Sequence, residues 1–254
     1  MRIKLSLLKA QENNNTAIPL HHQKNLSLFL NNLIREMSPQ MTCYCFSSLK
    51  GTSKVVNGQI RFLSSKISLT ISCPESLQLE TLVKKIFSVG TIDISGLQLI
   101  PKSYKVMAEP EFRTETKYIC ISPVIPGPVF TGEEPLPVDP ETHEFSDILF
   151  DTIISKMEKA GYHESQLNEY AEFGITPDAD YIRKINNSSK KYARVYRNSD
   201  GESFHGYLLP FYVHAHPEVH KFIWERGIGL FTELGYGLLD TVPEAVPASA
   251  HITP

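Results

Sequence analysis

Apolar residues follow two different periods in the first hundred residues of this chain. Residues 1–8 alternate between apolar and polar positions, which predicts a half-buried strand. From Leu26 to Ile34 apolar residues recur every three or four positions, as in an amphipathic helix. The same two periods return later, predicting extended runs over 42–48, around 60–71 and over 91–100, and a second helix over 79–87.

Two short motifs mark the connections between these elements. Asn57-Gly58 lies between extended runs and is typical of a hairpin turn. The segment 72–75, Ser-Cys-Pro-Glu, predicts a capping box at the start of the second helix. The resulting order, strand-helix-strand-strand-helix-strand, is that of a ferredoxin-like unit, in which one face of the sheet stays open.

The second half has a similar but less regular pattern of apolar and polar positions. Residues 123–140 hold six of the 17 prolines and predict a long exposed loop, whereas 165–185 stays ambiguous. The other elements that we expect are strands over 118–123, 190–197, 207–213 and 236–242, and helices over 145–157 and 217–226. The predicted fold class is therefore α+β, with two tandem ferredoxin-like (RRM-like) domains over residues 1–105 and 106–254.

Four of the 14 glycines lie close together in the loop that we expect between the last helix and the last strand. They are Gly227, Gly229, Gly235 and Gly237, in the spacing G-x-G-x5-G-x-G. This spacing is neither a dinucleotide fingerprint nor a P-loop. The glycines either let backbone N–H groups converge on a phosphate or allow close packing of the chain.

Charge is unevenly distributed in a chain whose net charge is −3. Residues 183–197 include basic but no acidic side chains, and 133–151 include acidic side chains but no Lys or Arg. The first segment includes KKYARVYR, whose aromatic and basic residues suit RNA contact: Lys190, Lys191, Tyr192, Arg194, Tyr196 and Arg197. A solvated hairpin is the alternative for this strip.

Several classes of protein are disfavoured by composition. The four cysteines make no disulfide framework and are expected as reduced thiols. No apolar run is long enough to span a bilayer, and the N-terminal residues lack the apolar core of a secretory signal, so we expect a cytoplasmic protein without a membrane partner. His214, His216 and His220 have a spacing that zinc sites also use, but surface or capping histidines are the favoured interpretation.

The glycine spacing resembles the C-terminal glycine-rich motif of the CRISPR-associated endoribonucleases that process precursor crRNA. Weaker similarities extend along nearly the whole chain, at residues 1–7, 18–23, 45–49, 206–211 and 216–218. The resemblance implies repeat RNA as partner, no cofactor and no metal. It also implies attack of a 2′-hydroxyl on the scissile phosphate, leaving a 2′,3′-cyclic phosphate. An effector complex and a homodimer are further partners that it suggests.

The chain departs from this family's pattern at the catalytic histidine, because residues 35–44 contain none. Asn31 stands where the resemblance leads us to expect a tyrosine, and the glycine loop has Glu233 in place of a cation. The catalytic residues that we predict are His22, then His21, with Tyr44 or Lys50 as helpers and His205 as a further candidate. The alternative is a member that binds repeat RNA and cuts it weakly or not at all.

Overall fold

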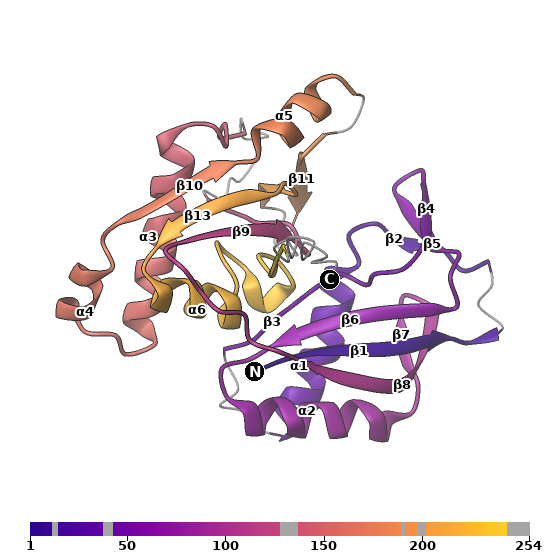
Figure 1. The fold of residues 1–254 in the computed structure, drawn as a ribbon. Helices are drawn as coiled ribbons and strands as arrows, with labels where there is room; N and C mark the ends of the chain where they lie inside the picture. Colours follow the sequence, from indigo (N-terminus) through magenta and orange to yellow (C-terminus); the bar gives the residue numbers. More distant parts are fainter. Residues whose placement is uncertain (12–14, 38–42, 128–136, 189–190, 198–201, 243–254) are drawn as a thin grey trace, which may run out of the picture.

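Each half of the chain forms an antiparallel sheet with two helices packed against it (Figure 1). The structure, a computed structural model, describes residues 1–11, 15–37, 43–127, 137–188, 191–197 and 202–242. In this part of the chain no helix has the length and apolar character needed to cross a bilayer.

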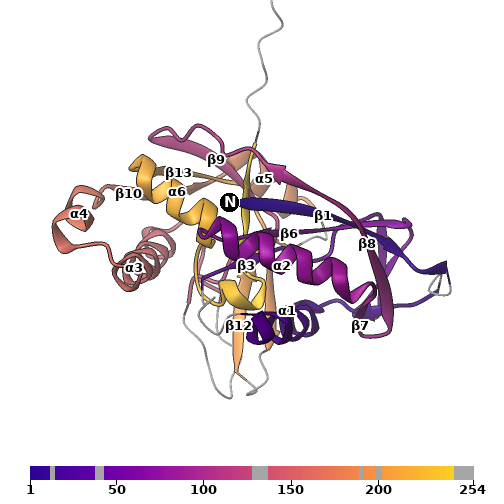
Figure 2. The same cartoon turned by 90° about the horizontal axis from the view of Figure 1, so that it is seen from below.

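The first sheet has the strand order β3-β6-β1-β8-β7, and Figure 2 shows α2 lying across it. Alternation in β1 buries Ile3, Leu5 and Leu7 and leaves Lys4 exposed, as predicted. The apolar faces of α1 and α2 complete this core. The elements are β1 (Arg2–Lys9), α1 (Gln23–Met37), β3 (Cys45–Phe46), β6 (Lys66–Ser72), α2 (Ser76–Val89), β7 (Ile92–Ile94) and β8 (Leu97–Met107).

Three details of the first half differ from prediction. The capping box is wrong, because Ser72 ends β6 and donates to the carbonyl of Trp224 (3.3 Å) while Glu75 is the N-cap of α2. The predicted strand 91–100 is two strands, β7 and β8, joined by a turn at Ser95-Gly96 with positive φ at both residues. Of the predicted strand 42–48, only β3 is a strand in the described part.

The Asn57-Gly58 hairpin is confirmed, with φ of 52° and 71°, the conformation that a type I′ turn needs. It joins β4 (Ser53–Val56) to β5 (Gln59–Phe62), and β2 (Ile18–Pro19) pairs with β5. These strands form a separate three-stranded sheet, which projects beside the first sheet in Figure 1.

The second sheet, β10-β13-β9-β14, repeats the strand order of the first, so the predicted fold class of two tandem ferredoxin-like units is confirmed. The division after residue 105 remains a prediction, and β8 runs two residues past it. The elements are β9 (Glu115–Cys120), α3 (His143–Lys159), α4 (Glu164–Glu169), β10 (Phe173–Pro177), α5 (Ala179–Asn186), β11 (Ala193–Arg197), β12 (Ser203–Tyr207), β13 (Phe211–Ala215), α6 (Pro217–Arg226) and β14 (Leu239–Thr241).

The predicted strand pair of the second half is partly wrong. Residues 193–197 pair with β12 in a two-stranded ribbon outside the main sheet, and the second strand of that sheet is β10, from the ambiguous segment. The predicted strand 207–213 is interrupted at 208–210, where Pro210 supplies no N–H for a ladder. Residues 198–201 and half of the proline-rich loop predicted over 123–140 lie outside the described residues.

The two halves meet where side chains of the first sheet cap the C-terminal end of α6. The guanidinium of Arg2 is buried (2% exposed), donates to the carbonyls of Trp224 and Leu239, and lies 3.3 Å above the Trp224 ring. The thiol of Cys45 donates to the carbonyl of Glu225 (3.7 Å). The last carbonyls of a helix lack partners within it and carry partial negative charge, so a cation from the other half stabilises this end.

Replacing Arg2 by methionine tests this junction. We expect Arg2→Met to lower the free energy of unfolding by about 3 kcal/mol, because a buried acceptor loses its donor and the cation–π contact is lost. Urea unfolding measures the change. Lys4→Met, at an exposed position of the same strand, is the control and should change stability by less than about 0.5 kcal/mol. Equal effects of the two substitutions would contradict the proposed role of Arg2.

Candidate functional site

The glycine-rich loop lies between α6 and β14, where the sequence places it. Its backbone packs tightly against neighbouring backbone segments. A Cβ on Gly237 would lie 1.9 Å from the carbonyl oxygen of Ile228, and one on Gly229 would lie 2.3 Å from that of Ile125. Both glycines have positive φ, of 70° and 75°. No other residue fits these positions, since both the backbone conformation and the space exclude a side chain.

The loop uses most of its glycine amides internally. The N–H groups of Gly227, Gly235 and Gly237 donate to the carbonyls of Ile223, Thr232 and Pro123. These donors are therefore not free to converge on a phosphate. Of the two alternatives that the sequence left open, the structure supports close packing.

The apolar interior of the loop packs against the β11-β12 ribbon. Leu230, Phe231 and Leu234 contact a small core that includes Phe204 and Tyr196. Tyr196 is only 4% exposed, so its ring is part of this core and does not lie on the surface. The β11-β12 ribbon therefore covers one side of the loop and also carries basic side chains.

The loop has a cation that the sequence pattern does not reveal. Lys156 of α3 donates to the carbonyl of Gly229 and to the hydroxyl of Thr232 (3.2 Å). Burial lowers the pKa of Lys156 to about 8, although the charge of Glu233 opposes this. The sequence contains one sign of this contact: Lys156 stands next to Met157, an apolar residue on the buried side of α3.

A chain of hydrogen bonds links the loop to the first half. The Tyr44 hydroxyl donates to the Asn31 amide oxygen (2.6 Å), the Asn31 amide NH₂ to the Ser27 hydroxyl (3.2 Å), and that hydroxyl to the Glu233 carbonyl (3.3 Å). Burial, together with the charge of Glu233, raises the pKa of Tyr44. Tyr44 is therefore a neutral, bonded phenol that holds α1 against the loop.

Two small cavities flank this chain. One, of about 180 Å³, is basic because Lys156, Lys159 and Arg226 line it together with Tyr44 and Glu233. The other, of about 140 Å³, lies between α1, the ribbon and the loop. Its lining combines two cations with polar and aromatic groups: Lys24, Ser27, Leu28, Asn31, Arg197, Phe204, Leu234 and Tyr236.

The structure separates the two neighbouring histidines that the sequence predicts as catalytic. His22 is 2% exposed, and its Nε2 accepts a hydrogen bond from the Leu49 N–H (3.1 Å). Burial lowers the pKa of His22 to about 4. His21 is exposed, and its ring lies 4.4 Å from the ring of Tyr196. Partial burial of its ring beside Tyr196, and then the charge of Arg194, lower the pKa of His21.

The other predicted residues lie at different places. Lys50 pairs through its backbone with Ser68. His205 pairs with Val195 and so lies on the face of the ribbon opposite to Tyr196. Lys191, Arg194 and Arg197 are exposed, Tyr192 is half-buried, and Lys190 lies outside the described residues.

The histidines of the zinc alternative have separate structural roles. His220 contacts the Tyr118 hydroxyl (3.0 Å), His216 caps α6, and His214 lies 3.1 Å from Glu172. Within the described ranges, no group of three or more His, Cys, Asp or Glu side chains could hold a metal ion. The zinc alternative therefore has no ligand set in this part of the chain.

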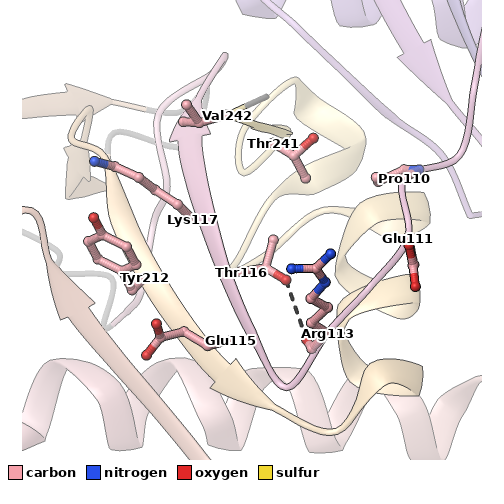
Figure 3. Close-up of a pocket in the computed structure, with 9 residues that line it drawn as sticks. All are labelled: Pro110, Glu111, Arg113, Glu115, Thr116, Lys117, Tyr212, Thr241 and Val242. Atoms are coloured by element: carbon pink, nitrogen blue, oxygen red, sulfur yellow. Dashed lines mark hydrogen bonds between the residues drawn. The ribbon is translucent and has the colours of Figure 1, made fainter. Parts of the chain in front are cut away.

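A further cavity, of about 490 Å³, lies on the second sheet beside the segment that joins the halves (Figure 3). Its charges are mixed, because Glu111 and Glu115 line it as well as Arg113 and Lys117. Lys117 also pairs with Asp178 and lies 4.9 Å from the ring of Tyr212. This charge balance does not favour a polyanion.

The comparison with known families identifies the class of this protein. The model of the family described as CRISPR associated protein Cas6, C-terminal, matches residues 107–241. This match covers more than half of the chain, which therefore belongs to the Cas6 family of CRISPR-associated proteins. No match was found among curated protein sequences.

Solved structures with the same fold cover almost the whole chain. A Cas6-related protein from Pyrococcus furiosus is 20% identical, with a TM-score of 0.80 over 96% of this chain and 99% of that chain. A protein described as a RAMP protein binding different RNA substrates is 19% identical, with a TM-score of 0.77 over 95% and 99%. At these identities the likeness shows the fold alone.

Gly229→Ala tests the close packing of the loop. We expect it to lower the free energy of unfolding by about 2 kcal/mol more than Gly90→Ala, because overpacking costs about 1–3 kcal/mol beyond the cost of positive φ. Gly90 is the matched control, with φ of 76° and nothing within 4 Å of its would-be Cβ. Thermal or urea unfolding measures both. Equal losses would mean that the backbone conformation alone requires glycine at position 229.

Proposed function

We propose that this protein binds CRISPR repeat RNA in precursor transcripts and cleaves it, without a metal ion, to give mature crRNA. The 2′-hydroxyl upstream of the scissile phosphate loses its proton and attacks the phosphorus. The bond to the 5′-oxygen breaks and that oxygen takes up a proton, which balances the one removed from the 2′-hydroxyl and leaves a 2′,3′-cyclic phosphate and a 5′-hydroxyl. Family membership and the similar structure described as binding different RNA substrates support RNA as the ligand.

The observation that carries the proposal is the position of His21, two residues before α1 and beside the basic β11-β12 ribbon. Its pKa is lowered, so the ring is neutral near pH 7 and able to accept a proton. Arg194 is close enough to act on that pKa, and Lys24 and Arg197 line the adjacent cavity. Cations beside a candidate base suit the phosphates on either side of a scissile bond.

His22, Tyr44 and the glycines have a supporting role in this proposal. The buried ring of His22 fixes the loop before α1 through the Leu49 N–H. Tyr44 holds α1 against the glycine-rich loop through the hydrogen bonds of Asn31 and Ser27, and the glycines let the loop backbone pack closely. Lys50 stays a weaker candidate as a helper, and a homodimer or an effector complex stays a prediction.

A second candidate function is repeat-RNA binding with little or no cleavage. It is favoured by the burial of His22 and Tyr44, which removes two of the predicted catalytic groups from the surface. The absence of histidine from residues 35–44 points the same way.

Cleavage of a repeat RNA in excess EDTA distinguishes the two. We expect wild-type protein to give a product with a 2′,3′-cyclic end, and His21→Ala to slow cleavage by about 10²–10⁴-fold with little change in RNA affinity. Gel analysis of labelled RNA measures the rate, and fluorescence anisotropy the affinity. His143→Ala, at an exposed histidine of α3, is the control and should cleave normally.

Each other result has a definite meaning. Cleavage of RNA with a 2′-deoxy scissile nucleotide would exclude the proposed reaction, and full activity of His21→Ala would exclude His21 as the base. Tight binding without cleavage would establish the second function. Absence of both binding and cleavage would reject the RNA role.

A further inference from the structure

Residues 13–74 form a basic segment within this mildly acidic protein. They contain one acidic residue, Glu36, and six basic ones: Lys24, Arg35, Lys50, Lys54, Arg61 and Lys66. This gives about five net positive charges, against −3 for the whole chain. A local surplus of this kind is the electrostatic mark of a nucleic-acid surface even when the whole protein is acidic.

The small sheet β2-β5-β4 brings part of this charge to one face. Because side chains alternate along a strand, Ile60 and Phe62 turn toward the first core, and Phe62 is buried there. Lys54 pairs with Arg61 in the ladder, and Val56 with Gln59, so these four side chains share the outer face.

This outer face is concave and free of acidic groups among the residues described. A cavity of about 320 Å³ lies on it, lined by Asn15, Ala17, Lys54, Val56, Asn57, Gln59 and Arg61. Two cations can contact phosphates, and three side-chain amides can exchange hydrogen bonds with ribose hydroxyls and base edges. Val56, 51% exposed, offers an apolar contact for a base or sugar. A single-stranded RNA matches this combination of cations, amides and one apolar contact, and no acidic residue is among the described residues that line the cavity.

The face is continuous with the proposed active site. β2 ends at Pro19, two residues before His21. The N–H of Leu20 donates to the carbonyl of Gly58 (2.8 Å), which ties the hairpin turn to the segment that carries His21. Figure 1 shows β2, β4 and β5 together at one side of the N-terminal half. An RNA strand that runs from His21 along Leu20 and Pro19 therefore reaches the β4-β5 hairpin next.

We propose that the outer face of β2-β5-β4 binds the sugar–phosphate backbone of single-stranded RNA next to the nucleotides held at His21. This inference rests on the proposed RNA function and adds a second contact region to it. The hairpin gives affinity and fixes the direction of the strand, while the chemistry stays at His21.

The double variant Lys54→Gln/Arg61→Gln tests this face. We expect its Kd for repeat RNA to rise about tenfold or more, and the slope of log K against log salt to fall by about 1.4, since each phosphate contact on a single strand contributes about 0.7. Fluorescence anisotropy at several salt concentrations measures both. Lys102→Gln/Lys105→Gln removes two exposed charges of β8 and should change neither value.

Two further measurements keep the outcome decisive. Lys54→Arg/Arg61→Lys should bind nearly as wild type, and circular dichroism melting should show that the Gln variant is folded. If wild type binds repeat RNA and the folded Gln variant binds it with the same Kd and salt slope, the hairpin surface is excluded. If wild type does not bind repeat RNA at all, the proposed function itself fails.

Discussion

The contact of Arg2 with the end of α6 is the interaction on which the candidate site depends. Its guanidinium reaches from the first strand of one sheet to Trp224, at the end of the helix before the glycine-rich loop, and to Leu239, just after the loop. Both ends of the loop are therefore anchored to the first half of the chain. A buried cation is costly to desolvate, and the partial negative charge of the helix end, together with the charge of Asp240, offsets that cost.

The loop between these anchors acts mainly as a packing element. Gly229 and Gly237 let backbone segments meet closer than any side chain permits, and Leu230, Phe231 and Leu234 fill the space against the ribbon. This packing brings α1, the ribbon and α3 to one place. The positive charge around the loop therefore comes from these neighbours, through Lys24, Arg197 and Lys156.

Local patterns predicted what depends on local chemistry. The period-2 run before Lys9, the apolar spacing of α1, the Asn57-Gly58 turn and the place of the glycine loop all lie where the sequence indicates. Strand β10 was missed because Gly174 and Pro177 weaken its alternation, whereas Ala193–Arg197, from the more regular KKYARVYR run, forms one strand of a ribbon outside the sheet. The burial of His22 could not be predicted, because its hydrogen-bond partner, the Leu49 N–H, lies 27 residues away in the sequence. Lys156 was missed for the same reason, since its partners are 73 and 76 residues away in the sequence.

The central claim is that RNA binds where α1, the ribbon and the glycine-rich loop meet, and follows the basic surface toward the hairpin. Hydrogen–deuterium exchange with and without repeat RNA tests it most directly. We predict slower exchange on RNA binding in residues 15–31, 53–62 and 193–197. Protection confined to β9 and β13, around the mixed-charge cavity of Figure 3, would contradict the claim.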